Sequence, residues 1–79
     1  MNDLEYATFE TVVKVTHHFQ REWRYGQAVM NVLSYMRPDM YNLVRETELN
    51  CFHRDDLAPA LMNWLRTGVP AVPERRPWI

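Results

Sequence analysis

The sequence predicts an all-α fold, a small bundle of four helices followed by an extended, proline-rich C-terminal tail. Apolar residues recur at the three- and four-residue spacing of a helix face. Helix-breaking residues separate these segments at Gly26, Pro38 and Gly68. With 47 % hydrophobic residues, the 79-residue chain is too apolar to be disordered and holds one domain. We expect a helical domain at 1–67 and a flexible tail at 68–79.

The first helix is expected from about Asp3 to Trp23 and should be the longest. Asn2 or Asp3 is placed to cap its start. One face carries Phe9, Val12, Val13, Thr16, Phe19 and Trp23. Because β-branched residues are poor intrinsic helix formers, this helix depends on packing.

The next two helices are separated by a proline. Arg24, Tyr25 and Gly26 mark the junction with the first helix, where glycine permits a turn, a helix end or a close approach. The second helix runs to about Tyr35 or Met36. Its inner face carries Ala28, Val29, Val32, Leu33 and Met36. Pro38 ends it and begins the third helix, which reaches about Glu46.

A loop at Thr47–His53 precedes the fourth helix, with Leu49 and Phe52 as apolar plugs. Asp55 is expected to cap that helix, and Asp56 to complement its dipole. Its inner face carries Leu57, Leu61, Trp64 and Leu65, and Gly68 ends it. Three prolines at 69–79 prevent further helix in the tail.

Charge and cysteine usage narrow the class of protein. The net charge of -1 gives no bulk attraction to nucleic acid or anionic membranes. The single cysteine, Cys51, excludes an internal disulfide and suits a reducing compartment such as the cytoplasm. The acidic start is unlike a secretory signal, and no apolar run reaches the ~20 residues of a membrane-spanning helix.

Candidate chemical sites are weak. Cys51, His53, Asp55 and Asp56 include metal-ligand types, but a zinc site needs further ligands. The remaining histidines, His17 and His18, are adjacent on a helix and point about 100° apart. Cys51 and His53 have no evident orienting group for nucleophilic catalysis. We therefore expect no catalytic residue, metal, cofactor or small-molecule substrate.

Two polar residues are predicted to have a structural role. Gln27 and Asn31 lie four apart on the second helix, beside its apolar face. We expect their amides to bond the backbone of the Thr47–His53 loop, with contact to a partner as the alternative. A helix-turn-helix at helices two and three is disfavoured, because Asp39, Arg45 and Glu46 leave the recognition helix nearly neutral.

The aromatic residues give the best indication of function. So small a core has little room for all of its tyrosines and tryptophans, and surface aromatics are typical interface anchors. The predicted partner-binding residues are Trp23, Tyr25, Tyr35, Tyr41, Arg75, Arg76 and Trp78. The last three form an Arg-Arg-Pro-Trp motif that either docks on an acidic, aromatic-lined groove or acts as a plain tether.

A resemblance to known proteins is carried by Arg24 to Leu33, Pro38, Tyr41, Val44, Thr47, Asn50 to Phe52, Asp55 and Trp64. With these residues, the central part of the chain resembles a family of small helical phage- and prophage-encoded proteins. The shared pattern is Arg-x-Gly-Gln-x-x-x-Asn-x-Leu, a proline, and a Thr-x-x-Asp-x-Phe loop. Asn50 replaces the aspartate of that loop here. The resemblance spans residues 24–65 and implies an accessory protein acting in the cytoplasm of a bacterial host.

These observations together favour a non-enzymatic protein-interaction module. We expect it to bind or inhibit a host protein, including a defence component, or to self-associate as a homodimer. The alternative is a small nucleic-acid-associated regulator, and a virion component is a third reading.

Overall fold

The computed structural model describes residues 1–68, and in this range the chain forms four α-helices and one 3₁₀ turn. The helices are α1 (Asp3–Phe19), α2 (Tyr25–Met36), α3 (Pro38–Val44) and α4 (Ala58–Thr67). The 3₁₀ turn η1 (Asp55–Leu57) leads directly into α4. This described part has no β-strand, so the predicted all-α class is confirmed. The tail predicted at 68–79 lies, beyond Gly68, outside the described residues.

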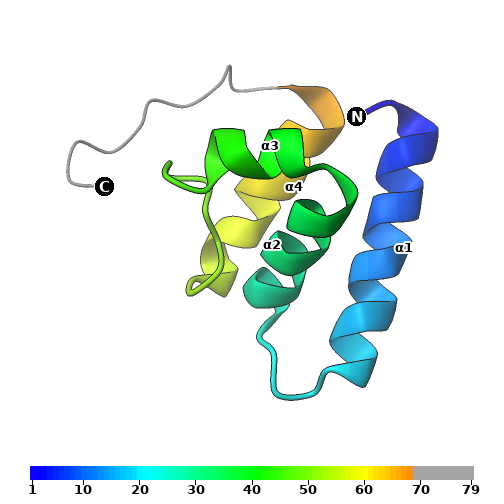
Figure 1. Cartoon of the computed structure of the whole chain (residues 1–79), viewed down its shortest axis with the longest axis vertical. Coiled ribbons are helices and arrows are strands. Elements are labelled where there is room, and N and C mark those ends of the chain that lie inside the picture. Colours follow the sequence, from blue (N-terminus) through cyan, green and yellow to red (C-terminus); the bar gives the residue numbers. More distant parts are fainter. Residues whose placement is uncertain (69–79) are drawn as a thin grey trace.

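Helix α2 is the centre of the fold. Figure 1 shows α1 running beside it along one edge of the molecule, with α3 and α4 on the other side. Because α2 has neighbours on several sides, half of its 12 residues are buried, including Met30. The inner face predicted for α2 is confirmed at Val29 and Leu33.

The core is built from all four helices and the loop before η1. Its fully buried members outside α2 include Phe9 and Val13 from α1 and Leu61 and Leu65 from α4. Leu49 of the loop is buried with them, as its apolar character predicted. Each of these side chains removes apolar surface from water, which is the main force that holds such a small domain together.

Helix α1 ends four residues earlier than predicted, at Phe19 rather than Trp23. The amide of Gln20 donates to the Thr16 carbonyl at 2.8 Å, and the amide of Trp23 donates to Gln20 in the following turn at 3.0 Å. Trp23 therefore lies in the segment that connects α1 to α2, where its side chain lines the same surface as Val12 and Thr16 of α1. Apolar spacing predicted a longer helix because it does not distinguish these two geometries.

Two residues assigned to the inner face of α1 are exposed. Phe19 is 75 % exposed and Val12 is 37 % exposed. The physical reason is that α1 lies at the edge of the molecule and buries only its narrow Phe9 and Val13 side. The predicted core stripe is thus split between the core and the surface.

The helix ends follow their local chemistry. The side chain of Asn2 accepts from the Glu5 amide at 2.7 Å, so Asn2 is the cap of α1. Pro38 opens α3 as predicted, although α3 ends at Val44 rather than Glu46. Gly68 ends α4 in the left-handed conformation, with φ of 75°.

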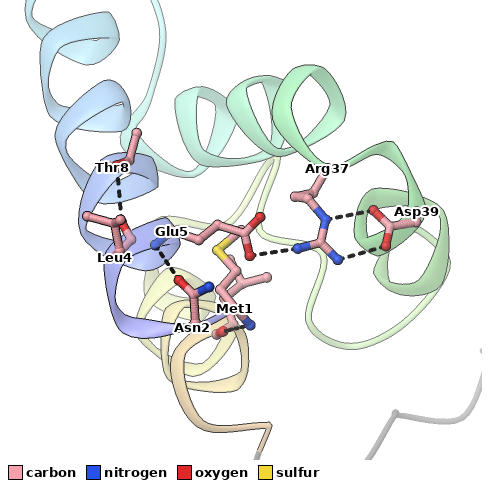
Figure 2. Close-up of polar contacts among 8 residues, drawn as sticks. Met1, Asn2, Leu4, Glu5, Thr8, Arg37 and Asp39 are labelled. Atoms are coloured by element: carbon pink, nitrogen blue, oxygen red, sulfur yellow. Dashed lines mark hydrogen bonds and ion pairs between the residues drawn. The ribbon is translucent and has the colours of Figure 1, made fainter.

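An ion-pair cluster at one corner ties α1 to the start of α3 (Figure 2). The Arg37 guanidinium donates two parallel hydrogen bonds to Asp39, at 3.0 and 2.9 Å, and a third to Glu5 at 2.7 Å. In the same corner, the amino group of Met1 donates to the Leu65 carbonyl at 2.9 Å. The beginning of α1 is therefore fixed both to α3 and to the last turn of α4.

Candidate functional site

Asp55 caps a different helix from the one predicted. Its Oδ1 accepts from the Gly26 amide at 2.9 Å, and no side-chain hydrogen bond caps η1 or α4. Gly26 itself lies in the first turn of α2 rather than at the junction before it. The first turn of a helix has unpaired amides, and the side chain of the local cap residue Arg24 accepts no hydrogen bond from them. Asp55 fills that role from 29 residues away.

The backbone of the loop packs directly on Gly26. A Cβ atom at this position would overlap the carbonyl oxygen of Cys51. The Cys51 thiol in turn lies 3.5 Å from the Gly26 carbonyl oxygen. Glycine is therefore required at Gly26 for a close approach, which is one of the three roles that the sequence left open.

The loop supplies its own hydrogen bonds. Buried Thr47 donates its hydroxyl to the Val44 carbonyl at 2.7 Å and accepts from the Leu49 amide at 3.2 Å. Asn50 donates to the Arg45 carbonyl at 2.6 Å and accepts from the Phe52 amide at 2.9 Å. Within residues 1–68, Thr47 and Asn50 thus make the hydrogen bonds to the loop backbone that were predicted for Gln27 and Asn31. Gln27 and Asn31 are half-buried on α2.

The residues around Cys51 form a structural cluster. The Cys51 side chain is fully buried, and burial raises the pKa of its thiol to about 11. The Asp56 carboxylate pairs with Arg54 at 2.7 Å, which lowers the pKa of Asp56. Across residues 1–68, no three histidine, cysteine or acidic side chains gather in an arrangement that could hold a metal ion.

A groove of about 310 Å³ lies between α1 and α2, and we call it the α1–α2 groove. It is lined by Val12, Thr16, Trp23, Asn31, Val32 and Tyr35. None of these side chains carries a charge at neutral pH. Two of the predicted partner-binding aromatics, Trp23 and Tyr35, thus lie in one groove. Tyr35 is 90 % exposed.

The remaining predicted aromatics lie elsewhere. Tyr25 and Tyr41 are partly buried against the core, together with Tyr6. The ring of Tyr25 contacts the ring of His17 edge-on, with 5.5 Å between the ring centres. The pKa of Tyr25 is raised, mainly by burial and also by the charge of Glu10. Arg75, Arg76 and Trp78 fall outside the described residues.

A second groove lies between α1 and α4, with a volume of about 470 Å³. It is lined by Tyr6, Glu10, Pro59, Met62, Asn63 and Arg66. Its acidic and basic side chains, Glu10 and Arg66, distinguish it from the uncharged α1–α2 groove. Burial is the main cause that raises the pKa of Tyr6 here, and the neighbouring Glu10 adds to it.

Several basic side chains already face carboxylates. Arg37 pairs with Glu5 and Asp39, Arg54 with Asp56, and Lys14 with Glu10 at 3.7 Å. Charge that is balanced locally contributes little to binding the phosphates of nucleic acid. This arrangement is the opposite of the basic stripe that a nucleic-acid-binding face carries.

Sequence reasoning missed that Val12 and Thr16 belong to a surface groove. Both were assigned to the inner face of the first helix, because apolar periodicity identifies a stripe but does not show which of its residues another helix covers. Val32 also lines the groove, but it is buried as predicted. The available signal was the width of the stripe on α1, which exceeds what one neighbouring helix can bury.

Within the described range, no helix is both long and apolar enough to cross a membrane. Comparison of the chain with family models, curated proteins and solved structures found no match.

Proposed function

We propose that this chain is a non-enzymatic protein-interaction module that binds a bacterial host protein through the α1–α2 groove. The observation that carries the proposal is the exposure of Tyr35 beside Trp23 in an uncharged groove. Aromatic anchors in apolar recesses supply much of the energy of protein interfaces. The groove lining offers no carboxylate, imidazole or amine for acid–base chemistry, which favours binding over catalysis.

The phage-encoded origin in this proposal rests on the resemblance over residues 24–65. Parts of that pattern have structural roles here, since Gly26 meets the loop backbone and Thr47 organises the loop. The groove is only partly inside this range: Asn31 belongs to the pattern, whereas Val12 and Thr16 lie outside it. An accessory protein of this kind can act as an inhibitor of host defence.

Affinity capture from host-cell extract with Tyr35 variants tests the proposal. Tyr35→Ala removes an exposed ring and should leave folding unchanged while reducing capture of the host protein at least ~10-fold, as for an interface anchor. Leu43→Ala, at another exposed apolar position on α3, is the matched control. The captured protein is then purified and titrated against each variant. Equal binding by wild type and Tyr35→Ala would exclude the groove as the contact surface.

A chain ending at Gly68 tests the predicted contribution of Arg75, Arg76 and Trp78 in the same assay. Loss of capture only in this shortened chain would move the contact from the groove to the tail. Binding of full-length protein to duplex DNA across a salt series tests the nucleic-acid alternative. A steep loss of affinity with salt would favour that regulator over the host-protein reading.

A further inference from the structure

Helix α1 carries an uncharged stripe on the side that faces away from the core. We call it the outer stripe. It consists of Leu4, Thr8, Thr11, Val15 and Phe19. All five residues are exposed, and Leu4 and Phe19 at its two ends are 78 % and 75 % exposed. The charged residues of α1 lie off this stripe, where Lys14 pairs with Glu10 and Glu5 pairs with Arg37.

The outer stripe is distinct from the α1–α2 groove. From the 3.6-residue period, the stripe centres about 80° around α1 from the groove-lining side formed by Val12 and Thr16. It spans about 22 Å from Leu4 to Phe19 at the helical rise per residue. Figure 1 shows no other helix on the outer side of α1. An uncharged strip of this length on a single edge helix is the geometry of helix-to-helix pairing.

The stripe is complementary to itself in the antiparallel direction. A two-fold axis between residues 11 and 12 places Leu4 opposite Phe19 of a second copy and Thr8 opposite Val15. At the centre, Thr11 lies next to Thr11 of the second copy, so small β-branched side chains meet where the helices are closest. The large end residues then cover each other. Such a surface is isologous, which is the requirement for a closed dimer.

The charges on α1 also favour the antiparallel direction. Acidic Asp3 and Glu5 occupy its first turn, and His17 and His18 occupy its last turn. Antiparallel pairing opposes the two helix dipoles, so the acidic first turn of each helix lies beside the last turn of the other copy. Parallel pairing would align like ends. The stripe itself brings no like charges together in either copy.

The available area indicates a weak, reversible dimer. The exposed parts of the five stripe residues on two copies would bury on the order of 1,000 Å² in total, near the lower limit for a specific interface. This area is well below that of an obligate dimer, so we expect the pairing to depend on concentration.

We propose that two copies of this chain pair antiparallel through the outer stripe of α1. The inference goes beyond the proposed function, because it uses a different side of α1. The two-fold axis that relates the copies places both α1–α2 grooves on the same side of the dimer. A host protein with two sites, or two tethered host proteins, would then be bound with avidity.

Sedimentation of the full chain from micromolar to millimolar concentration tests the pairing. Wild type should move from monomer to dimer over this range. Phe19→Glu should weaken dimerisation at least ~10-fold, because pairing would bury a carboxylate against Leu4 of the second copy. The exposure of Phe19 leaves the fold intact in this variant, which circular dichroism checks. Leu43→Glu, an exposed apolar position on α3, is the control and should dimerise like wild type.

Cross-linking through introduced cysteines tests the direction, because the native Cys51 thiol is buried. Thr11→Cys, next to the axis, should form an intermolecular disulfide by itself. Phe19→Cys should do so only when mixed with Leu4→Cys. A disulfide between two Phe19→Cys chains would instead show parallel pairing and overturn the proposal.

Two further outcomes separate this inference from the proposed function. If wild type stays monomeric throughout and Phe19→Glu loses host-protein capture, the stripe binds the host protein and self-pairing is excluded. If Phe19→Glu abolishes dimerisation but Tyr35→Ala does not affect capture, self-pairing stands and the groove proposal fails.

Discussion

The carboxylate of Asp55 accepts a hydrogen bond from the amide of Gly26 at 2.9 Å, joining the start of η1 to the first turn of α2. The same turn packs against the Cys51 carbonyl, so one small contact region holds the loop, η1 and α2 together. This relationship explains how a loop with little regular structure keeps a fixed position on the central helix.

Replacing Gly26 should be strongly destabilising. Gly26→Ala places a Cβ atom against the Cys51 carbonyl oxygen, and backbone cannot move aside as a flexible side chain can. We expect a loss of ~3 kcal/mol in the free energy of unfolding, measured by urea denaturation. Gly68→Ala is the comparison, since it has open space but a positive φ, and should cost only about 1 kcal/mol. Equal losses in the two variants would contradict the close-approach role of Gly26.

Removing the Asp55 carboxylate should cost as much as losing a helix cap. Asp55→Ala leaves the Gly26 amide without its acceptor, and we expect a loss of about 1–2 kcal/mol in unfolding free energy. Asp55→Asn keeps an acceptor oxygen and should lose less. Asp56→Ala breaks only an exposed pair with Arg54 and serves as the control. A greater loss from Asp56→Ala than from Asp55→Ala would be inconsistent with this capping role.

Acid should weaken the corner formed by Arg37. Its guanidinium beside Asp39 lowers the pKa of that carboxyl from 3.8 to about 2. A lowered pKa in the folded state contributes stability above pH 3.8, and this contribution is lost as the pH falls through about 2. The stability difference between wild type and Asp39→Asn should therefore shrink over that range. In an NMR titration, Arg37→Met should return the Asp39 midpoint towards 3.8; an unchanged midpoint would refute the assignment.

Cys51 should be protected from thiol reagents in the native protein. The side chain is fully buried, and burial raises the pKa of its thiol to about 11, so little thiolate exists near neutral pH. Labelling by a disulfide reagent should be slow in buffer and fast in denaturing urea. A surface variant such as Leu43→Cys provides the exposed reference and should label at once at its introduced thiol. Rapid labelling of native Cys51 would show that the loop opens from α2.

Local chemistry predicted most of the helix boundaries. Asn2, Pro38 and Gly68 act within a few residues of their own position, so their roles follow from sequence alone. The capping of α2 by Asp55 could not be predicted from sequence alone, because the contact spans 29 residues and an aspartate before a helix is normally taken as the cap of that helix. Long-range pairs of this kind leave no signal in local pattern.

The candidate site was predictable only in part. Surplus aromatic residues indicated an interface, but their number did not show which ones the core would bury. Tyr35 is 90 % exposed and lines the α1–α2 groove, whereas Tyr25 and Tyr41 are partly buried against the core. Phe19 was misplaced for a related reason, since an edge helix exposes part of an apolar stripe that a central helix would bury.

The central position of α2 has a consequence for how the chain folds. Its contacts with α1 and α3 join segments that are neighbours in sequence, so they cost little loop-closure entropy and form early. The contact between Gly26 and Asp55 closes a much longer loop and should form after the folding transition state. Asp55→Ala should therefore accelerate unfolding and leave the folding rate almost unchanged, which the two arms of a urea chevron measure separately.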